Sequence, residues 1–272
     1  MLLAGFPPLT IALLVAILAA SALMSGLSGF GFSAIGALCL IFLPPKLGVP
    51  LLMTLSAANQ IMSLRQLKAD MAPIKQWWPN GPAPYLLGGL IGVPIGLAIL
   101  SSLPTGDLML VFGGFLVIYA GYSLARPHGV HKTVGGGWLA SSLVGMSGGV
   151  IGGFTAFPGA AVVVWNGLRH VPKREARAIV QPYIFVLQLL SISLLALQKP
   201  ETFGPRYWLL VAITVPVVLP CTLVGVRLYK QLSDVNFRRV TFILLGVSGI
   251  GLLIKAADTF PAVVHAMKTA GL

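Results

Sequence analysis

Residues 145–159 read GMSGGVIGGFTAFPG, in the middle of an apolar stretch from Trp138 to Trp165 that contains no charged residue. A straight helix crosses the roughly 30 Å hydrocarbon core with about 20 residues, so this stretch is too long for one crossing and too short for two. Glycine and proline at this density end helices and allow a tight reversal. We therefore predict a helix–loop–helix hairpin over residues 138–165 whose tip lies inside the membrane.

A second glycine-rich run lies near the start of the chain. Residues 26–36 read GLSGFGFSAIG, inside an apolar stretch from Leu9 to Leu43. The same length argument predicts a second broken hairpin over residues 9–43. Both runs contain Gly-x-Ser-Gly, 119 positions apart, and a Pro-Lys pair follows each of them.

The composition places these hairpins in a lipid bilayer. The 272 residues are 57% hydrophobic and 9% charged, with a mean hydropathy of +0.93, whereas a soluble domain is about 25% charged. We therefore predict an all-α polytopic membrane protein of the cell (plasma or inner) membrane. Lys and Arg in cytoplasmic loops account for the net charge of +12, so no nucleic-acid partner is expected.

The remaining apolar segments complete two halves with the same order of features. An amide-bearing helix follows each hairpin, with Asn59 and Gln60 in the first half and Gln181 and Gln188 in the second. Internal duplication of this kind is common in transporters. The predicted first repeat, residues 1–133, contains hairpin 9–43 and helices 47–64, 84–103 and 107–124, and the second, residues 134–272, contains hairpin 138–165 and helices 178–197, 207–229 and 237–254.

The charges of the loops indicate how the two repeats are related. If each hairpin enters and leaves on one side, 13 of the 18 Lys and Arg residues share a side, whereas ordinary crossings divide them 9 to 9. The excess of Lys and Arg in cytoplasmic loops favours the first arrangement. The repeats are therefore predicted to be inverted, with both termini outside and the loop from Arg65 to Lys75 in the cytoplasm.

Two inverted hairpins would bring their tips together near the midplane. A helix broken there leaves backbone groups that lipid cannot satisfy, and a helix N-terminus aimed at the centre favours an anion. Glycine also lets an oxyanion approach the backbone closely. No catalytic residue, cofactor or metal site is predicted. The residues predicted to bind a small anionic substrate are Ser28, Gly29, Gly31, Ser33, Asn59, Gln60, Ser147, Gly148, Gly149, Thr155, Pro158, Gly159 and Gln188.

The second hairpin and the segment after it resemble a known family. GGFTAFPGAAVVV at residues 152–164, followed by RHVPKREARA at residues 169–178, is similar to the second signature of the TauE/SafE membrane permeases. The resemblance extends over nearly the whole chain and implies export of sulfite or organosulfonates. The chain departs from the family pattern at Ala160 and Ala161, where two prolines are common, and at Phe30, which interrupts a run of adjacent glycines.

Two other functions fit the sequence. A passive anion channel is one, because no titratable residue is expected at mid-depth to couple transport to an ion. A rhomboid-type intramembrane serine protease is the other, because of Gly-x-Ser-Gly. All four histidines lie in predicted loops or the tail, which leaves the serine without a base. The small residues also fit helix packing alone, and the sequence leaves open the anion, the coupling ion, the direction and the oligomeric state, a homodimer included.

The predicted orientation determines which loops an impermeant reagent reaches. In a background with Cys39 and Cys221 replaced by Ser, the variants Lys68→Cys and Lys173→Cys should resist an impermeant maleimide added to intact cells. Lys199→Cys should react, and all three should react after the membrane is permeabilised. Reaction of Lys173→Cys from outside, with Lys68→Cys protected, would contradict the inverted arrangement.

Overall fold

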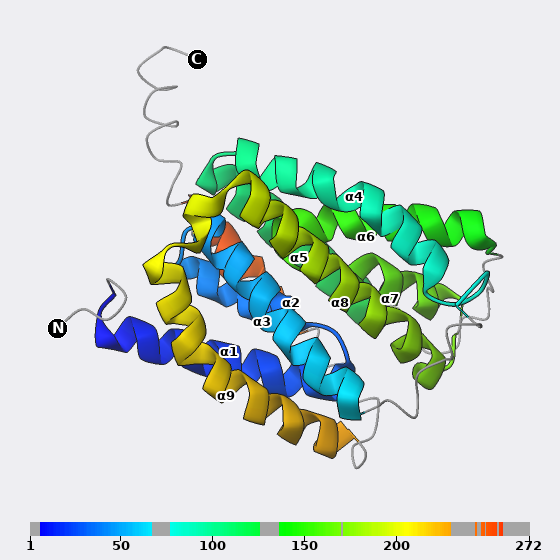
Figure 1. Cartoon of the computed structure of the whole chain (residues 1–272), viewed down its shortest axis with the longest axis horizontal. Helices are drawn as coiled ribbons and strands as arrows, with labels where there is room; N and C mark the ends of the chain where they lie inside the picture. Colours follow the sequence, from blue (N-terminus) through cyan, green and yellow to red (C-terminus); the bar gives the residue numbers. More distant parts are fainter. Residues whose placement is uncertain are drawn as a thin grey trace.

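The computed structural model describes residues 6–66, 77–125, 136–169 and 171–229, with positions 243, 246–247, 249–254 and 256–257 (Figure 1). Every regular element in these ranges is helical, so the predicted all-α fold is confirmed. The loop after residue 66, the predicted repeat boundary at residues 133 and 134, both chain ends and much of the predicted helix 237–254 lie outside the described residues. All four histidines, His128, His131, His170 and His265, lie outside them as well.

The glycine-rich stretches are each divided into two helical arms.

Five of the helices described, α1, α3, α4, α8 and α9, are long and apolar enough to cross a membrane. The elements are α1 (Pro8–Ser28), α2 (Phe32–Gly36), the 3-10 helix η1 (Ala37–Ile41), α3 (Pro45–Gln66), α4 (Ala83–Ser102), α5 (Thr105–Ala125), α6 (Trp138–Thr155), α7 (Gly159–Leu168), α8 (Lys173–Gln198), the 3-10 helix η4 (Pro200–Phe203) and α9 (Pro205–Tyr229).

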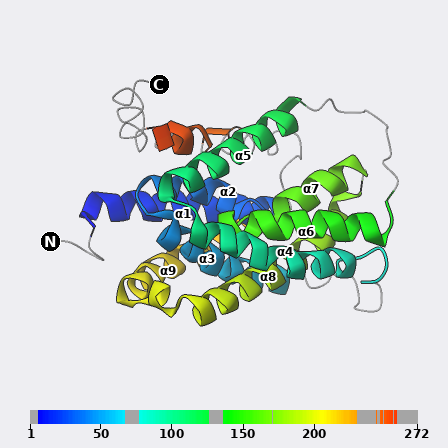
Figure 2. The same ribbon diagram turned by 90° about the horizontal axis from the view of Figure 1, so that it is seen from above.

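Helices α3 and α8 form the centre of the molecule and run in opposite directions. The start of α3 and the end of α8 line the same cavity, and the two helices pack along each other. On one side of this pair α1 lies along α9, and on the other α4 lies along α6 (Figures 1 and 2). The short second arms contact the centre too, α2 against α3 and α7 against α8. Both broken hairpins therefore meet the central pair.

Glycine lets α4 and α6 approach until their backbones touch. Gly88, Gly92 and Gly96 recur every four residues on α4, and each faces a carbonyl of α6 so closely that a Cβ atom would overlap it. Gly149 and Gly153 of α6 meet α4 in the same way, with the Gly89 carbonyl 2.6 Å from a Cβ built on Gly149. Small residues at such spacing bring membrane helices into backbone contact.

Two further glycine contacts join the halves of the chain. Gly26 of α1 packs on Gly225 of α9, where a Cβ on Gly26 would lie 3.0 Å from the Gly225 Cα. Gly113 of α5 packs on Gly249 in the last helical segment, with the Gly249 carbonyl 2.9 Å from a Cβ on Gly113. The first half of the chain is therefore interleaved with the second.

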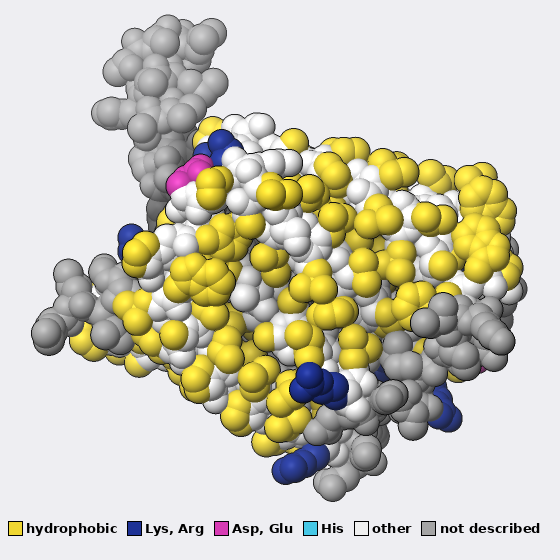
Figure 3. Space-filling view, in the orientation of Figure 1, with side chains coloured by type: hydrophobic (Ala, Val, Ile, Leu, Met, Phe, Trp, Pro, Cys, Tyr) yellow, Lys and Arg dark blue, Asp and Glu magenta, His cyan; other side chains and the backbone are white. Residues whose placement is uncertain are grey.

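The outer surface is that of a membrane protein. Apolar side chains cover the face in Figure 3, and the Lys and Arg side chains gather toward its upper left and lower edge. Large apolar side chains such as Leu9, Ile91 and Ile118 are 71%, 63% and 73% exposed, and extensive exposed apolar surface is typical of a face that contacts a membrane or another protein. The chain is a multi-pass membrane protein whose outer helical faces contact lipid.

The same substitution should have opposite effects on two helical glycines. Gly92→Ala forces a methyl group into the Met146 carbonyl of α6, and overpacking of this kind costs roughly 1–3 kcal/mol. Gly114 of α5 has open space around it, so Gly114→Ala should leave stability unchanged or raise it by up to about 1 kcal/mol through helix propensity. Melting temperatures in detergent measure both effects. Equal melting temperatures for the two variants would contradict the packing described here.

Candidate functional site

The first helix break is built by glycines with left-handed backbone conformations. α1 ends at Ser28, Gly29 follows with a φ of 79°, and Gly31 has a φ of 89°. The Gly29 N–H donates to the Ser25 carbonyl at 2.7 Å and closes the last turn of α1. Residues with a Cβ rarely adopt such φ values, which explains why glycine occupies both positions of the break.

The second break has the same form with different residues. α6 ends at Thr155, and Ala156 follows with a φ of 59°, its N–H bound to the Gly152 carbonyl at 2.8 Å. The left-handed conformation costs a non-glycine residue about 1–2 kcal/mol. Pro158 packs directly on Gly152, where a Cβ would lie 2.5 Å from the proline Cβ. This contact turns α7 back along α6.

Matching hydrogen bonds reveal the equivalent positions of the two breaks. The Ser28 hydroxyl accepts from the Phe30 N–H at 3.3 Å and donates to the Met24 carbonyl at 2.9 Å. The Thr155 hydroxyl does the same, accepting from the Phe157 N–H at 3.1 Å and donating to the Ile151 carbonyl at 2.6 Å. The breaks are therefore related by 155 − 28 = 127 positions, not by the 119 that separate the two Gly-x-Ser-Gly motifs.

The second Gly-x-Ser-Gly motif lies inside α6, well before the break. Ser147 is exposed, and its hydroxyl bonds the Val144 carbonyl of its own helix at 2.8 Å. Gly148 packs against the Tyr183 hydroxyl, which a Cβ would approach to 2.5 Å, and Gly149 against the backbone of α4. Gly159, at the start of α7, faces Ile184 of α8, where a Cβ would lie 2.7 Å from the Ile184 Cδ1. These four predicted site residues lie on packing or exposed faces.

The two breaks meet through side chains that bind their carbonyls. The Ser33 hydroxyl, just after the first break, donates to the Ala156 carbonyl in the second. Gln188 of α8 donates to the same carbonyl at 2.7 Å, and Gln60 of α3 donates to the Gly29 carbonyl at 3.4 Å. The structure thus brings Ser33, Gln60 and Gln188 together with both breaks.

Asn59 has a different role from its neighbour Gln60. Its amide nitrogen donates to the Ser25 hydroxyl of α1 at 2.8 Å, and its oxygen accepts from the Thr222 hydroxyl of α9 at 2.5 Å. Both ends of the amide are therefore bound within the protein. Asn59 ties α3 to the α1–α9 pair.

Several buried amide atoms near the breaks lack a partner. Gln181 is fully buried, and neither its oxygen nor its nitrogen has a hydrogen-bond partner among the described residues. The side-chain oxygens of Gln60 and Gln188 also lack a hydrogen-bond partner among the described residues. Buried polar atoms are nearly always hydrogen-bonded, because leaving one unpaired costs about 1–3 kcal/mol. These unpaired amide atoms favour the binding of a polar ligand beside them.

A buried arginine lies beside the first break. Arg177, the fifth residue of α8, is 8% exposed and donates to the Gly26 carbonyl at 2.9 Å and to the Leu27 carbonyl at 3.4 Å. These carbonyls at the end of α1 have no partner within their helix, and a cation there complements the helix dipole. A Cβ built on Gly29 would lie 2.9 Å from Nε of Arg177 and 3.1 Å from Nε2 of Gln181. The arginine and the amide therefore flank the same glycine.

Arg177 and Gln181 were not among the predicted site residues. Sequence alone groups Arg177 with the basic loop after the second hairpin, whereas the structure places it inside α8. Its spacing gives a usable signal, because residues 177, 181 and 188 repeat at intervals of four and seven and so share one face of a helix. A buried arginine in register with two amides is stronger evidence for a polar site than isolated glycines.

Neither a metal site nor a serine nucleophile with its base is seen among the described residues. No three His, Cys, Asp or Glu side chains there are placed to bind a metal ion. The Ser28 hydroxyl is engaged with the backbone of its own hairpin. The histidines that a serine nucleophile would need as a base lie outside the described part of the chain.

Helices broken inside an apolar body, with buried polar side chains facing the breaks, are common in secondary membrane transporters. The family described as "Sulfite exporter TauE/SafE" matches residues 13–252, and the chain belongs to that family. The resemblance noted over residues 152–178 is thereby confirmed, and the family is one of exporter-type transporters. No curated protein and no solved structure matches the chain.

Removing the arginine should destabilise the first hairpin. Arg177→Met leaves the Gly26 and Leu27 carbonyls without their cationic donor, and a hydrogen bond to a charged group contributes about 1.5–3 kcal/mol. We expect a clear drop in melting temperature, partly restored in Arg177→Lys. Arg227→Met, at an exposed position of α9, is the matched control and should melt like the unmodified protein. An unchanged melting temperature for Arg177→Met would show that the capping contact adds nothing to stability.

Proposed function

We propose that the chain is a secondary transporter of small anions, with sulfite, sulfonates and related oxyanions or carboxylates as candidates, in the cell membrane. The observation that carries this proposal is the buried Arg177 beside the unpaired amide of Gln181 at the first break. A cation and an N–H donor in one apolar region favour a negatively charged guest.

The charges around the breaks support an anion rather than a cation. The described acidic residues, Asp107, Glu175 and Glu201, are all outside the buried set. Helix α7 begins directly after the second break, so the positive end of its dipole lies there. Gln181 and Gln188 are seven residues apart on α8, which separates them by about 10 Å along the helix. Of the three glutamines, Gln181 has the side-chain nitrogen without a partner among the described residues, and an anion beside it would accept from that nitrogen.

The paths of the two hairpins support the inverted-repeat arrangement and alternating access. Phe6, just before α1, lies under Arg206 at 4.1 Å, and Pro44, just before α3, lines the same cavity as Arg206. The first hairpin therefore begins and ends at one end of the molecule. Gly136 and Arg169 flank the second hairpin and lie together, since a Cβ on Gly136 would be 3.1 Å from the arginine Nε. That hairpin begins and ends beside the start of α8, at the opposite end.

Two hairpins that enter from opposite ends can each open the shared site to its own side. The Ser33 contact with the Ala156 carbonyl and the burial of Gln60, Gln181 and Gln188 suit a closed state of such a cycle. A channel, by contrast, requires a continuous polar path. Saturable flux in liposomes supports the transporter, and flux that rises linearly with anion concentration would favour the channel.

A single amide should control anion affinity. Gln181→Leu removes a neutral donor next to Arg177 without adding charge, and losing one hydrogen bond to a charged ligand costs roughly 1.5–3 kcal/mol. We therefore expect the KM for uptake of sulfite or methanesulfonate into liposomes to rise about ten- to a hundredfold. Gln198→Leu is the matched control, because Gln198 is exposed near the end of the same helix. Equal KM values for the two variants would place the anion site elsewhere.

A further inference from the structure

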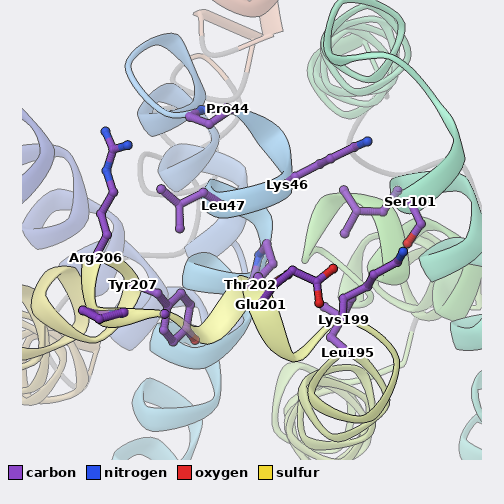
Figure 4. A pocket seen from close by; sticks show the side chains of 14 residues that line it. Pro44, Lys46, Leu47, Ser101, Leu195, Lys199, Glu201, Thr202, Arg206 and Tyr207 are labelled. Carbon is purple, nitrogen blue, oxygen red and sulfur yellow. The ribbon is translucent and has the colours of Figure 1, made fainter. Parts of the chain in front are cut away.

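A cavity of about 450 Å³ lies at the end of the molecule away from Arg177. The start of α3, the end of α4, the end of α8 with η4 and the start of α9 surround it (Figure 4). Small-molecule sites are typically about 300–1,000 Å³. The cavity therefore has the size of a binding site. None of its lining residues is among those assigned to the hairpin breaks.

The charged side chains of the cavity are arranged to receive an anion. Lys46 and Lys199 come from different helical ends and extend toward the side where Ser101 lies, whereas Arg206 extends to the other side (Figure 4). The Arg206 guanidinium is instead over the Phe6 ring. Glu201 is the acidic residue of the lining. Two ammonium groups against one carboxylate leave this part of the cavity with a net positive charge.

The rest of the lining is mainly apolar. Leu47, Leu100 and Leu195 contribute to it, together with prolines from the helix starts. At about 30 Å³ for each water, 450 Å³ corresponds to roughly 15 waters, far more than a bare oxyanion displaces. An apolar wall of this extent is well matched to a ligand with its own hydrocarbon part.

Tyr207 separates the cavity from the interior of the bundle. Tyr207 is 1% exposed and lines the cavity, and its hydroxyl hydrogen-bonds the Thr54 hydroxyl of α3. Gln60 follows six residues later on the same helix, which is about 9 Å of helical rise. The last α3 residue of the lining is Pro50, ten residues before Gln60, so about 15 Å of helical rise separates the cavity from that amide.

We propose that this cavity is a vestibule that binds an organic anion with one sulfonate or carboxylate head on a short apolar body. Lys46 and Lys199 bind the head, with Ser101 beside them as a hydroxyl donor, and Leu47 and Leu195 contact the apolar body. The identification of this ligand with the transported anion rests on the proposed function. Binding itself rests on the cavity alone.

Lysine acetylation measures occupancy of the cavity without any transport. Purified protein in a neutral detergent is treated with an acetylating ester, and mass spectrometry follows the rate at Lys46 and Lys199. 1-Butanesulfonate should slow both rates several-fold, while sulfite at equal ionic strength has a much smaller effect. Lysines elsewhere in the chain should react at unchanged rates. Equal effects of both anions, or no protection of Lys46 and Lys199, would overturn the proposal.

Charge variants test the site from a second direction. In Lys199→Gln, the butanesulfonate concentration that half-protects Lys46 should rise about tenfold. Arg227→Gln, which removes the same charge at the far end of α9, should leave it unchanged. A lipid head group shares this chemistry, so the measurement is repeated in nanodiscs of phosphatidylcholine and of phosphatidylglycerol. Protection by phosphatidylglycerol with no effect of butanesulfonate would assign the cavity to lipid and overturn the proposal.

The same variants separate this inference from the proposed function. Gln181→Leu should keep full protection of Lys46 and Lys199 although its transport is impaired. Protection without transport of any anion by the unmodified protein would leave the vestibule standing and remove the transporter. Normal transport in a Lys46→Gln, Lys199→Gln double variant, together with no protection of these lysines in the parent protein, would keep the transporter and remove the vestibule.

Discussion

Lipid cannot form hydrogen bonds with a peptide group, and the arrangement of this protein follows from that constraint. Two helices end inside the apolar body, so their last carbonyls need partners from the protein. Arg177 binds the carbonyls at the end of α1, Gln60 binds that of Gly29, and Gln188 binds that of Ala156. Arg177, Gln60 and Gln188 therefore supply partners that the two breaks need, and the Gln181 amide has no partner among the described residues.

Close helix packing is what brings these partners within reach. α4 touches α6 at the level of the backbone through glycines that recur at successive turns, and α1 touches α9 through Gly26 and Gly225. The contacts draw the breaks against α3 and α8, where the amides lie. Asn59 reinforces one of these contacts by bonding Ser25 and Thr222 at once. The site thus depends on packing several turns away from it.

The fold could be predicted from the sequence to a large extent, because length and composition are strong constraints in a bilayer. A stretch of 28 apolar residues with glycines at its centre has few solutions, and the predicted helix 84–103 matches Ala83–Ser102 closely. The roles of individual glycines could not be predicted, since the same residue serves close ligand approach and close helix packing. Gly149 and Gly159 proved to pack on neighbouring helices. Arg177 was missed because the depth of the first break relative to α8 is a tertiary property.

The glycine contacts between α4 and α6, called here the glycine seam, limit how the sequence can change. Gly88, Gly92 and Gly96 admit no side chain. Substitution of any of them would push α4 away from α6, whereas outward-facing leucines are under no such restriction. Arg177, Gln181, Lys46 and Lys199 lie outside α4 and α6, so they can change without separating these two helices. The family match therefore indicates the architecture of this chain more directly than its transported anion.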